Sequence, residues 1–305
     1  MGEQTTSPPP MASEGDVMTA PIVAGADGTD AGLDAVALAA SLARATGDPL
    51  LVACIHPDGT QPGAGAGDDV RGHASEVLEA ARSAAGDAGV ELRAVPSTSP
   101  ARGLAELAEQ ERARMLVVGS SNRGAIGRVV SGSTAERLLH GTGCPVAVAP
   151  RGYRRHRAGP PRALGVAFVD TPEGHEAVRV AADLAARSGL PLTLYSVVAV
   201  TTSWFTPPVV RPEEDVVPEE VRKGYREALD RALAELPDGV QATGVLLYGD
   251  VVDELSMVGE RGIDLLVCGS RGYGPVRRVL LGSVSAALVR QASVPVLVVP
   301  RGGET

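Results

Sequence analysis

Residues 119–151 read GSSNRGAIGRVVSGSTAERLLHGTGCPVAVAPR, and residues 269–301 read GSRGYGPVRRVLLGSVSAALVRQASVPVLVVPR. Aligned without a gap, the two stretches share glycines, a Gly-Ser pair and a proline, which are residues that determine the course of the backbone. The shared pairs include Gly119/Gly269, Gly124/Gly274, Gly132/Gly282, Ser133/Ser283 and Pro145/Pro295. Upstream, residues 21–55 align in the same way with residues 163–197. A repeat of this length indicates a duplicated domain rather than a solenoid.

Each copy alternates short apolar runs with amphipathic segments. The runs predicted as strands are 22–26, 50–55, 90–95, 115–120 and 145–149 in the first copy, and 164–169, 191–198, 240–247, 265–270 and 295–299 in the second. The segments predicted as helices are 31–46, 68–86, 101–113 and 133–140, followed by 174–188, 218–236, 251–261 and 283–291. This alternation is typical of βαβ units. We therefore predict an α/β fold with two tandem Rossmann-like domains, each a five-stranded parallel sheet with helices on both faces.

Length and composition agree with this organisation. A chain of 305 residues exceeds what one hydrophobic core usually organises. Apolar residues make up 44% and aromatic residues only 3%, so the cores must be built from Ala, Val and Leu. We expect a disordered tail over residues 1–18, a first domain over 19–151, a linker over 152–162 and a second domain over 163–301. The basic run at 151–157 is interpreted as part of a solvated linker.

Charge and cysteine content exclude several classes of protein. The net charge is −9, and the only lysine is Lys223, so we expect no binding to nucleic acid or to an anionic membrane. The three cysteines are far apart, with no spacing that suits zinc, and two lie within apolar runs. The proline-rich and acidic beginning of the chain is unlike a secretory signal peptide. These features predict a cytoplasmic protein.

The loop after the fourth strand of each copy carries the expected chemistry. In the second copy it starts with Gly269-Ser-Arg271-Gly272 and ends at Gly282-Ser283, where a helix begins. The unpaired N–H groups and the positive dipole end of a helix attract phosphate. Ser283 and Ser285 add hydroxyl groups at the same end. Asp27 and Asp170 follow the first strand of their copies, and strands one and four are neighbours in this topology, so each Asp and each loop should frame one pocket.

With these motifs the chain resembles the universal stress protein family. The resemblance rests on Gly-x2-Gly-x9-Gly-Ser after a hydrophobic strand, an Asp after strand one and a closing Pro-Val strand, and it spans residues 19–151 and 161–301. It implies an adenine nucleotide α-hydrolase-like fold and, in the ATP-binding branch of the family, ATP at the strand tips, alone or with Mg²⁺. In the second copy, Asp170 and Val197 would lie near adenine and Gly269 near the ribose, while Arg271, Gly272, Gly282, Ser283 and Ser285 would surround the phosphates. The corresponding residues of the first copy are Asp27, Ile55, Gly119, Asn122, Gly132, Ser133 and Thr134.

One departure from the motif distinguishes the copies. Asn122 stands where the motif has its second glycine, and Gly272 holds that place in the second copy. Asn adopts the left-handed conformation at the lowest cost among residues with a Cβ, but its side chain would crowd a phosphate. We expect ATP to bind more tightly to the second copy.

Other nucleotide-dependent activities lack their motifs. A P-loop ATPase needs GxxxxGK[ST], and Lys223 has no such glycines before it. A dinucleotide oxidoreductase needs GxGxxG at the first βα turn, where this chain has GADGTD or AFVDTP. An ATP-splitting ligase of related fold would need a Ser-Gly-Gly turn there. We therefore predict an ATP-binding regulator or sensor in stress response that is not an enzyme, although slow ATP hydrolysis is left open. The alternative is an interaction module of the same fold that works without nucleotide.

The last strand of each copy predicts how the halves associate. PVAVAP and PVLVVP are apolar runs that an exposed sheet edge would make prone to aggregation, so they should be covered. We expect them to pack against each other as an intramolecular pseudo-dimer, with a homodimer of the tandem chain left open.

Overall fold

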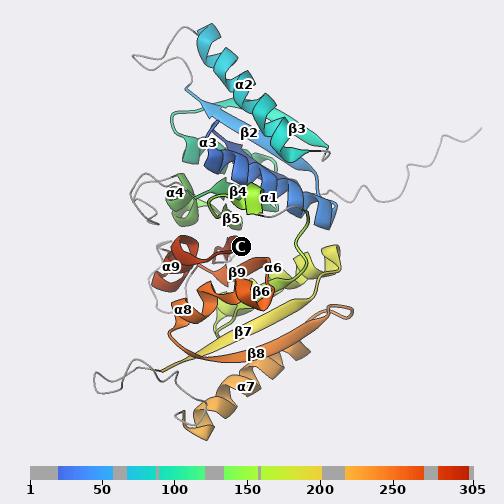
Figure 1. Cartoon of the computed structure of the whole chain (residues 1–305), viewed down its shortest axis with the longest axis vertical. Helices are drawn as coiled ribbons and strands as arrows, with labels where there is room; N and C mark the ends of the chain where they lie inside the picture. Colours follow the sequence, from blue (N-terminus) through green and yellow to red (C-terminus); the bar gives the residue numbers. More distant parts are fainter. Residues whose placement is uncertain are drawn as a thin grey trace, which may run out of the picture.

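The computed structural model describes residues 20–57, 67–86, 89–120, 134–156, 159–200, 217–270 and 281–301 (Figure 1). The strands of the first copy are β1 (Ile22–Ala26), β2 (Leu50–His56), β3 (Val90–Pro96), β4 (Met115–Gly119) and β5 (Val146–Ala149). Those of the second copy are β6 (Leu164–Ala167), β7 (Leu192–Ala199), β8 (Ala242–Gly249), β9 (Leu265–Gly269) and β10 (Val296–Val299). Within each copy every pairing is parallel, as predicted.

The helices alternate with these strands. In the first copy they are α1 (Asp30–Thr46), α2 (Gly67–Ala85), α3 (Pro100–Gln110) and α4 (Thr134–Gly141), followed by the short α5 (Tyr153–His156). In the second copy they are α6 (Pro172–Ser188), α7 (Glu219–Ala234), α8 (Val251–Ser256), the 3-10 helix η2 (Val258–Arg261) and α9 (Ser283–Gln291).

Matching caps set the bounds of the first helix in each copy. The Thr29 hydroxyl accepts from the N–H of Gly32 at the start of α1, and Thr171 does the same for Gly174 at the start of α6. Gly47 and Gly189 end these helices in the left-handed conformation, with φ of 73° and 68°. Threonine caps and terminal glycines are the expected chemistry at these places.

One continuous sheet runs through both copies. Its strand order is β3-β2-β1-β4-β5-β10-β9-β6-β7-β8, and its only antiparallel pair among the described strands is β5 with β10. Val146 lies opposite Val298, and Val148 opposite Val296. The prediction that the last strands of the two halves pack together is therefore confirmed. The pairing covers two apolar edges that would otherwise be exposed.

Two hydrophobic layers cover the sheet. Side chains alternate along each strand, so Ile22 and Ala24 face one layer while Val23, between them, faces the other. Helices α1, α2, α6 and α7 pack on the first face, and α3, α4, α8 and α9 pack on the second (Figure 1). The cores consist mainly of Ala, Val and Leu, as the composition predicts.

Several observed elements differ from the predicted ones by a few residues at their ends, and one predicted helix is divided. The strand predicted over 164–169 ends at Ala167, and the helix predicted over 251–261 divides at Met257 into α8 and η2. In η2, a Cβ on Gly259 would lie only 2.7 Å from Cγ1 of Val294. The tighter 3-10 turn thus brings the backbone against the loop before β10, an approach that only glycine permits.

Candidate functional site

The carboxyl ends of the central strands form the expected switch point in each copy. Strand β1 pairs with both β2 and β4, and β6 pairs with both β7 and β9. The connections therefore leave toward opposite faces at β1/β4 and at β6/β9. Ligands of open α/β sheets bind in the crevice at this position.

Asp27 lies exposed at the tip of β1. Its Oδ1 accepts from the backbone N–H of Thr29 at 3.1 Å and from the Thr29 hydroxyl at 2.6 Å. Gly28 between them has a φ of 78°, which allows the chain to turn this tightly. Both bonds use Oδ1, so Oδ2 can accept a hydrogen bond from a ligand above the strand tip.

The predicted equivalence of Asp27 and Asp170 is wrong by one residue. Thr29 and Thr171 cap corresponding helices. The residue directly before the cap is Gly28 in the first copy and Asp170 in the second. The residue two positions before the cap is Asp27 in the first copy and Val169 in the second. The packing agrees, because a Cβ on Gly32 would strike Asp27, and one on the corresponding Gly174 would strike Val169. The second copy thus presents Val169, a residue that is 38% exposed, where the first presents a carboxylate.

Asp170 is instead tied to neighbouring helices. Its Oδ1 lies 2.9 Å from Nε2 of His175 in α6, and its Oδ2 accepts from Arg231 in α7 at 2.8 Å. The His175 bond and then the Arg231 bond hold the pKa of the Asp170 carboxyl below its ordinary value. The ring of His175 also packs edge-on against Phe168 at 5.4 Å. Asp170 therefore holds the turn after β6 against α7, away from β9.

The glycines that end β4 and β9 have a packing role. A Cβ on Gly119 would lie 2.0 Å from the carbonyl oxygen of Ala31, and one on Gly269 would lie 2.9 Å from that of Glu173. The first turn of α1 or α6 thus crosses directly over the end of the neighbouring strand. This packing requires glycine even without a ligand. It also leaves the end of the strand free of a side chain.

Helix α9 begins beside the tip of β9. Gly282 occupies its N-cap and has no side chain to cap the helix, and the N–H of Gly282 donates to the carbonyl of Ser270 at 2.7 Å. Ser283 is exposed, whereas the buried Ser285 donates its hydroxyl to the carbonyls of Gly269 at 2.9 Å and Ser270 at 3.3 Å. The Ser285 hydroxyl therefore uses its proton to bond the helix to the end of β9. The donors that α9 could offer a ligand are then chiefly the backbone N–H groups of its first turn.

The other predicted residues lie at the same end of the sheet or outside the described residues. Ile55 and Val197 lie near the ends of β2 and β7, Ile55 half-buried and Val197 buried. Thr134 is the first residue of α4. The predicted residues outside the described ranges are Asn122, Gly132, Ser133, Arg271 and Gly272.

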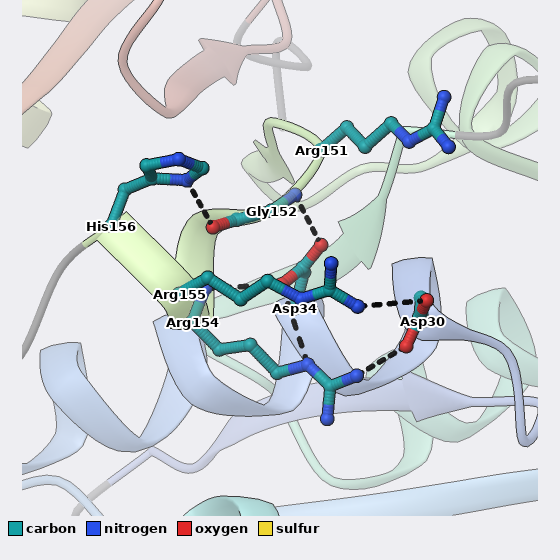
Figure 2. A pocket seen from close by; sticks show the side chains of 7 residues that line it. All are labelled: Asp30, Asp34, Arg151, Gly152, Arg154, Arg155 and His156. Atoms are coloured by element: carbon teal, nitrogen blue, oxygen red, sulfur yellow. Dashed lines mark hydrogen bonds and ion pairs between the residues drawn. The ribbon is translucent and has the colours of Figure 1, made fainter.

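The basic run after β5 is anchored, which the prediction of a solvated linker missed. The buried Asp34 accepts from the backbone N–H groups of Gly152 at 2.7 Å and Arg154 at 3.0 Å. Arg154 and Arg155 both pair with Asp30, while Arg151 points away (Figure 2). These groups line a pocket of about 260 Å³, formed by Asp30, Asp34, Arg151, Gly152, Arg154, Arg155 and His156. Opposite charges spaced across α1 and the basic run were the available sequence signal.

The arrangement suits a phosphate-bearing ligand. Helix α9 presents N–H donors, its neighbouring strand tip is cleared by Gly269, and Asp27 offers a free acceptor in the first copy. Within the described ranges no group of three or more His, Cys, Asp or Glu could hold a metal ion. The same part of the chain has no helix long and apolar enough to cross a membrane.

Comparison with known proteins gives a consistent result. Residues 18–150 and 162–300 each match the model of the universal stress protein family. A universal stress protein of Mycobacterium tuberculosis is 32% identical over 206 residues, covering 66% of this chain and 69% of the relative. A second from the same organism is 34% identical over 190 residues, covering 61% of each chain. The crystal structure of a universal stress protein from Archaeoglobus fulgidus covers 94% of this chain and 98% of its own, with a TM-score of 0.65 and 18% identity.

Proposed function

The chain belongs to the universal stress protein family, and from this premise we propose that it binds ATP at the strand tips and acts as a regulator or sensor in stress response. Proteins of this family are generally regulators rather than enzymes. The proposed sites lie at the carboxyl ends of β1/β4 and β6/β9. We further propose a cytoplasmic location and no more than slow ATP hydrolysis.

The start of α9 is the observation that carries this proposal. Its N-cap is a glycine, which has no side chain to cap the helix, and the helix begins next to the tip of β9 that Gly269 keeps clear. Such a helix end binds phosphate through its N–H groups and dipole. ATP, alone or with Mg²⁺, would place its phosphates there, near Ser283, with Gly272 and Arg271 in the preceding loop.

The two copies would use different parts of the nucleotide. The first has Asp27 at the strand tip to accept from the amino group of adenine, but Asn122 in its loop. The second has Gly272 in its loop, but Val169 at the strand tip. We propose tighter binding at the second copy because phosphate carries most of the charge of ATP. We also propose that the second copy distinguishes adenine from other bases less well, since valine cannot accept a hydrogen bond.

The alternative function is an interaction module that does not bind nucleotide. It is favoured by the packing role of Gly119 and Gly269, which explains part of the motif without a ligand. Identifying the nucleotide released when the freshly purified protein is denatured separates the two functions. Retained ATP supports the proposed function, and its absence together with no binding in solution supports the module.

Calorimetric titration of ATP into nucleotide-free protein then tests the loop chemistry. Gly272→Ala should weaken the second site about fivefold, because the motif predicts a left-handed turn there, in which a Cβ would cost about 1 kcal/mol. Gly282→Val should weaken it more, since it disturbs the helix end that presents the N–H groups. Asn122→Gly should strengthen the first site or leave it unchanged. Two equal sites that ignore Gly272→Ala and Gly282→Val would contradict the proposal.

A further inference from the structure

One hydrogen bond connects the first copy to the proposed phosphate site of the second. Nδ1 of His140, in the last turn of α4, accepts from the backbone N–H of Leu281 at 3.1 Å. Leu281 directly precedes Gly282, the N-cap of α9. Helices α4 and α9 lie next to each other across the β5–β10 junction (Figure 1).

Four described hydrogen bonds hold the start of α9. Gly282 donates to Ser270 at 2.7 Å, and Ser285 donates to Gly269 at 2.9 Å and to Ser270 at 3.3 Å, so these three lie within the second copy. The fourth is the His140 bond, and it comes from the first copy. Since these contacts set the direction in which the first N–H groups of α9 point, a residue of one copy helps to orient the donors of the other.

The chain cannot build the same arrangement in reverse. By the alignment that pairs Gly132 with Gly282, Arg290 corresponds to His140, and Ala135 corresponds to Ser285. A guanidinium has only donors and no lone pair to accept with, and alanine has no hydroxyl. The hydrogen bonds that His140 and Ser285 make at the start of α9 therefore have no chemical counterpart at the start of α4.

We propose that His140 is a positioning residue of the second nucleotide site, so that the first copy sets the phosphate affinity of the second. This proposal rests on the proposed ATP binding. The acceptor at Nδ1 holds Leu281, and through it the N-cap of α9, in the orientation in which the first-turn N–H groups meet phosphate. Because these donors are already oriented, phosphate binding does not have to include the entropy cost of ordering them.

The test compares His140→Leu with His140→Asn in the full chain. Asn keeps an acceptor oxygen close to the position of Nδ1, whereas Leu fills the space without one. ATP titration should show the second site about three- to tenfold weaker in His140→Leu, the range expected for one neutral hydrogen bond. His140→Asn should stay within about twofold of the wild type. The second site is identified as the one that Gly282→Val weakens.

A double variant separates positioning from damage to α4. His140 lies in the helix whose first turn belongs to the first site, so general loss of that helix would weaken the first site as well. In the Gly282→Val background, His140→Leu should leave the remaining first site unchanged. Equal second-site affinity in wild type and His140→Leu, equal losses in Leu and Asn, or a matching loss at the first site would each overturn the proposal. A wild-type chain that binds no ATP would instead overturn the proposed function first, and the positioning role with it.

Discussion

Asp48, in the turn after α1 of the first copy, is paired with Arg187 in α6 of the second, and its carboxylate is completely buried. Arg114 lies on its other side, with Nε 2.9 Å from Oδ2 of Asp48, and reaches Asp183 of α6 at 2.7 Å. Two guanidinium groups, one from each copy, thus converge on one buried carboxylate. Buried ion pairs therefore join the two copies, in addition to the β5–β10 strand pairing.

We predict that Asp48→Ala lowers the free energy of unfolding by roughly 3 kcal/mol. Removing the shared carboxylate leaves two arginines with reduced compensation, and breaking a buried pair from one side is strongly destabilising. The matched control is Asp183→Ala, whose side chain is 46% exposed and which should cost less than about 1 kcal/mol. Urea unfolding measures both, and equal effects would show that burial of Asp48 is not the deciding factor.

Gly119 and Gly269 provide a comparison at one position of the two copies. Gly119→Ala should destabilise by about 3 kcal/mol or more, because the new Cβ meets a backbone carbonyl oxygen at 2.0 Å. Gly269→Ala, with 2.9 Å available, should cost about 1–2 kcal/mol. The order is read from denaturant midpoints of the full chain. A larger loss for Gly269→Ala would contradict the packing described for these strand ends.

Asp27 and Asp170 should respond differently to the loss of charge. Asp27→Asn keeps the acceptor for Thr29 but presents an amide in place of Oδ2, so we expect the first site to bind ATP about three- to tenfold more weakly. Asp170→Asn should leave the second site unchanged, because that carboxylate is used by His175 and Arg231. Calorimetric titration measures both effects. A second site weakened by Asp170→Asn would show that Asp170 corresponds to Asp27 after all, contrary to the positions of the helix caps.

The cysteines should be inert in the folded protein. Burial raises the pKa of Cys268 to about 12 and that of Cys144 to about 11, and burial followed by the charge of Asp27 raises that of Cys54. Only the thiolate reacts, so raised pKa values mean little thiolate at pH 8. A disulfide reagent should label the native protein slowly at pH 8 and all three cysteines quickly in guanidinium. Fast labelling of the native protein would show that these side chains become accessible.

The sequence was sufficient to predict the fold because the strands and the longer helices have local signals in both copies. Alternating apolar runs, threonine caps and terminal glycines fix the elements, and the apolar last strands predict the β5–β10 pairing. The nucleotide site at the strand tips stays a prediction. One detail of the prediction was wrong. Asp27 and Asp170 both follow the first strand of their copy, but Asp27 lies two residues before the helix cap and Asp170 only one, so the two do not correspond.

The side-chain hydrogen bond between His140 and Leu281, which joins the copies, left no sequence signal. His140 and Leu281 are far apart along the chain, and each is an ordinary residue for its helix or loop. Such pairings depend on how the two copies are oriented, which the periodicity of either copy does not encode.

The antiparallel pairing of β5 with β10 also bears on how the two halves can change over time. In a two-fold homodimer each residue is present on both sides of the interface, so one substitution always alters both. Here the matching positions are encoded separately, and they already hold His140 on one side and Arg290 on the other. Covalent linkage thus frees each half to acquire its own mutations, so that one site can specialise while its neighbour becomes its support.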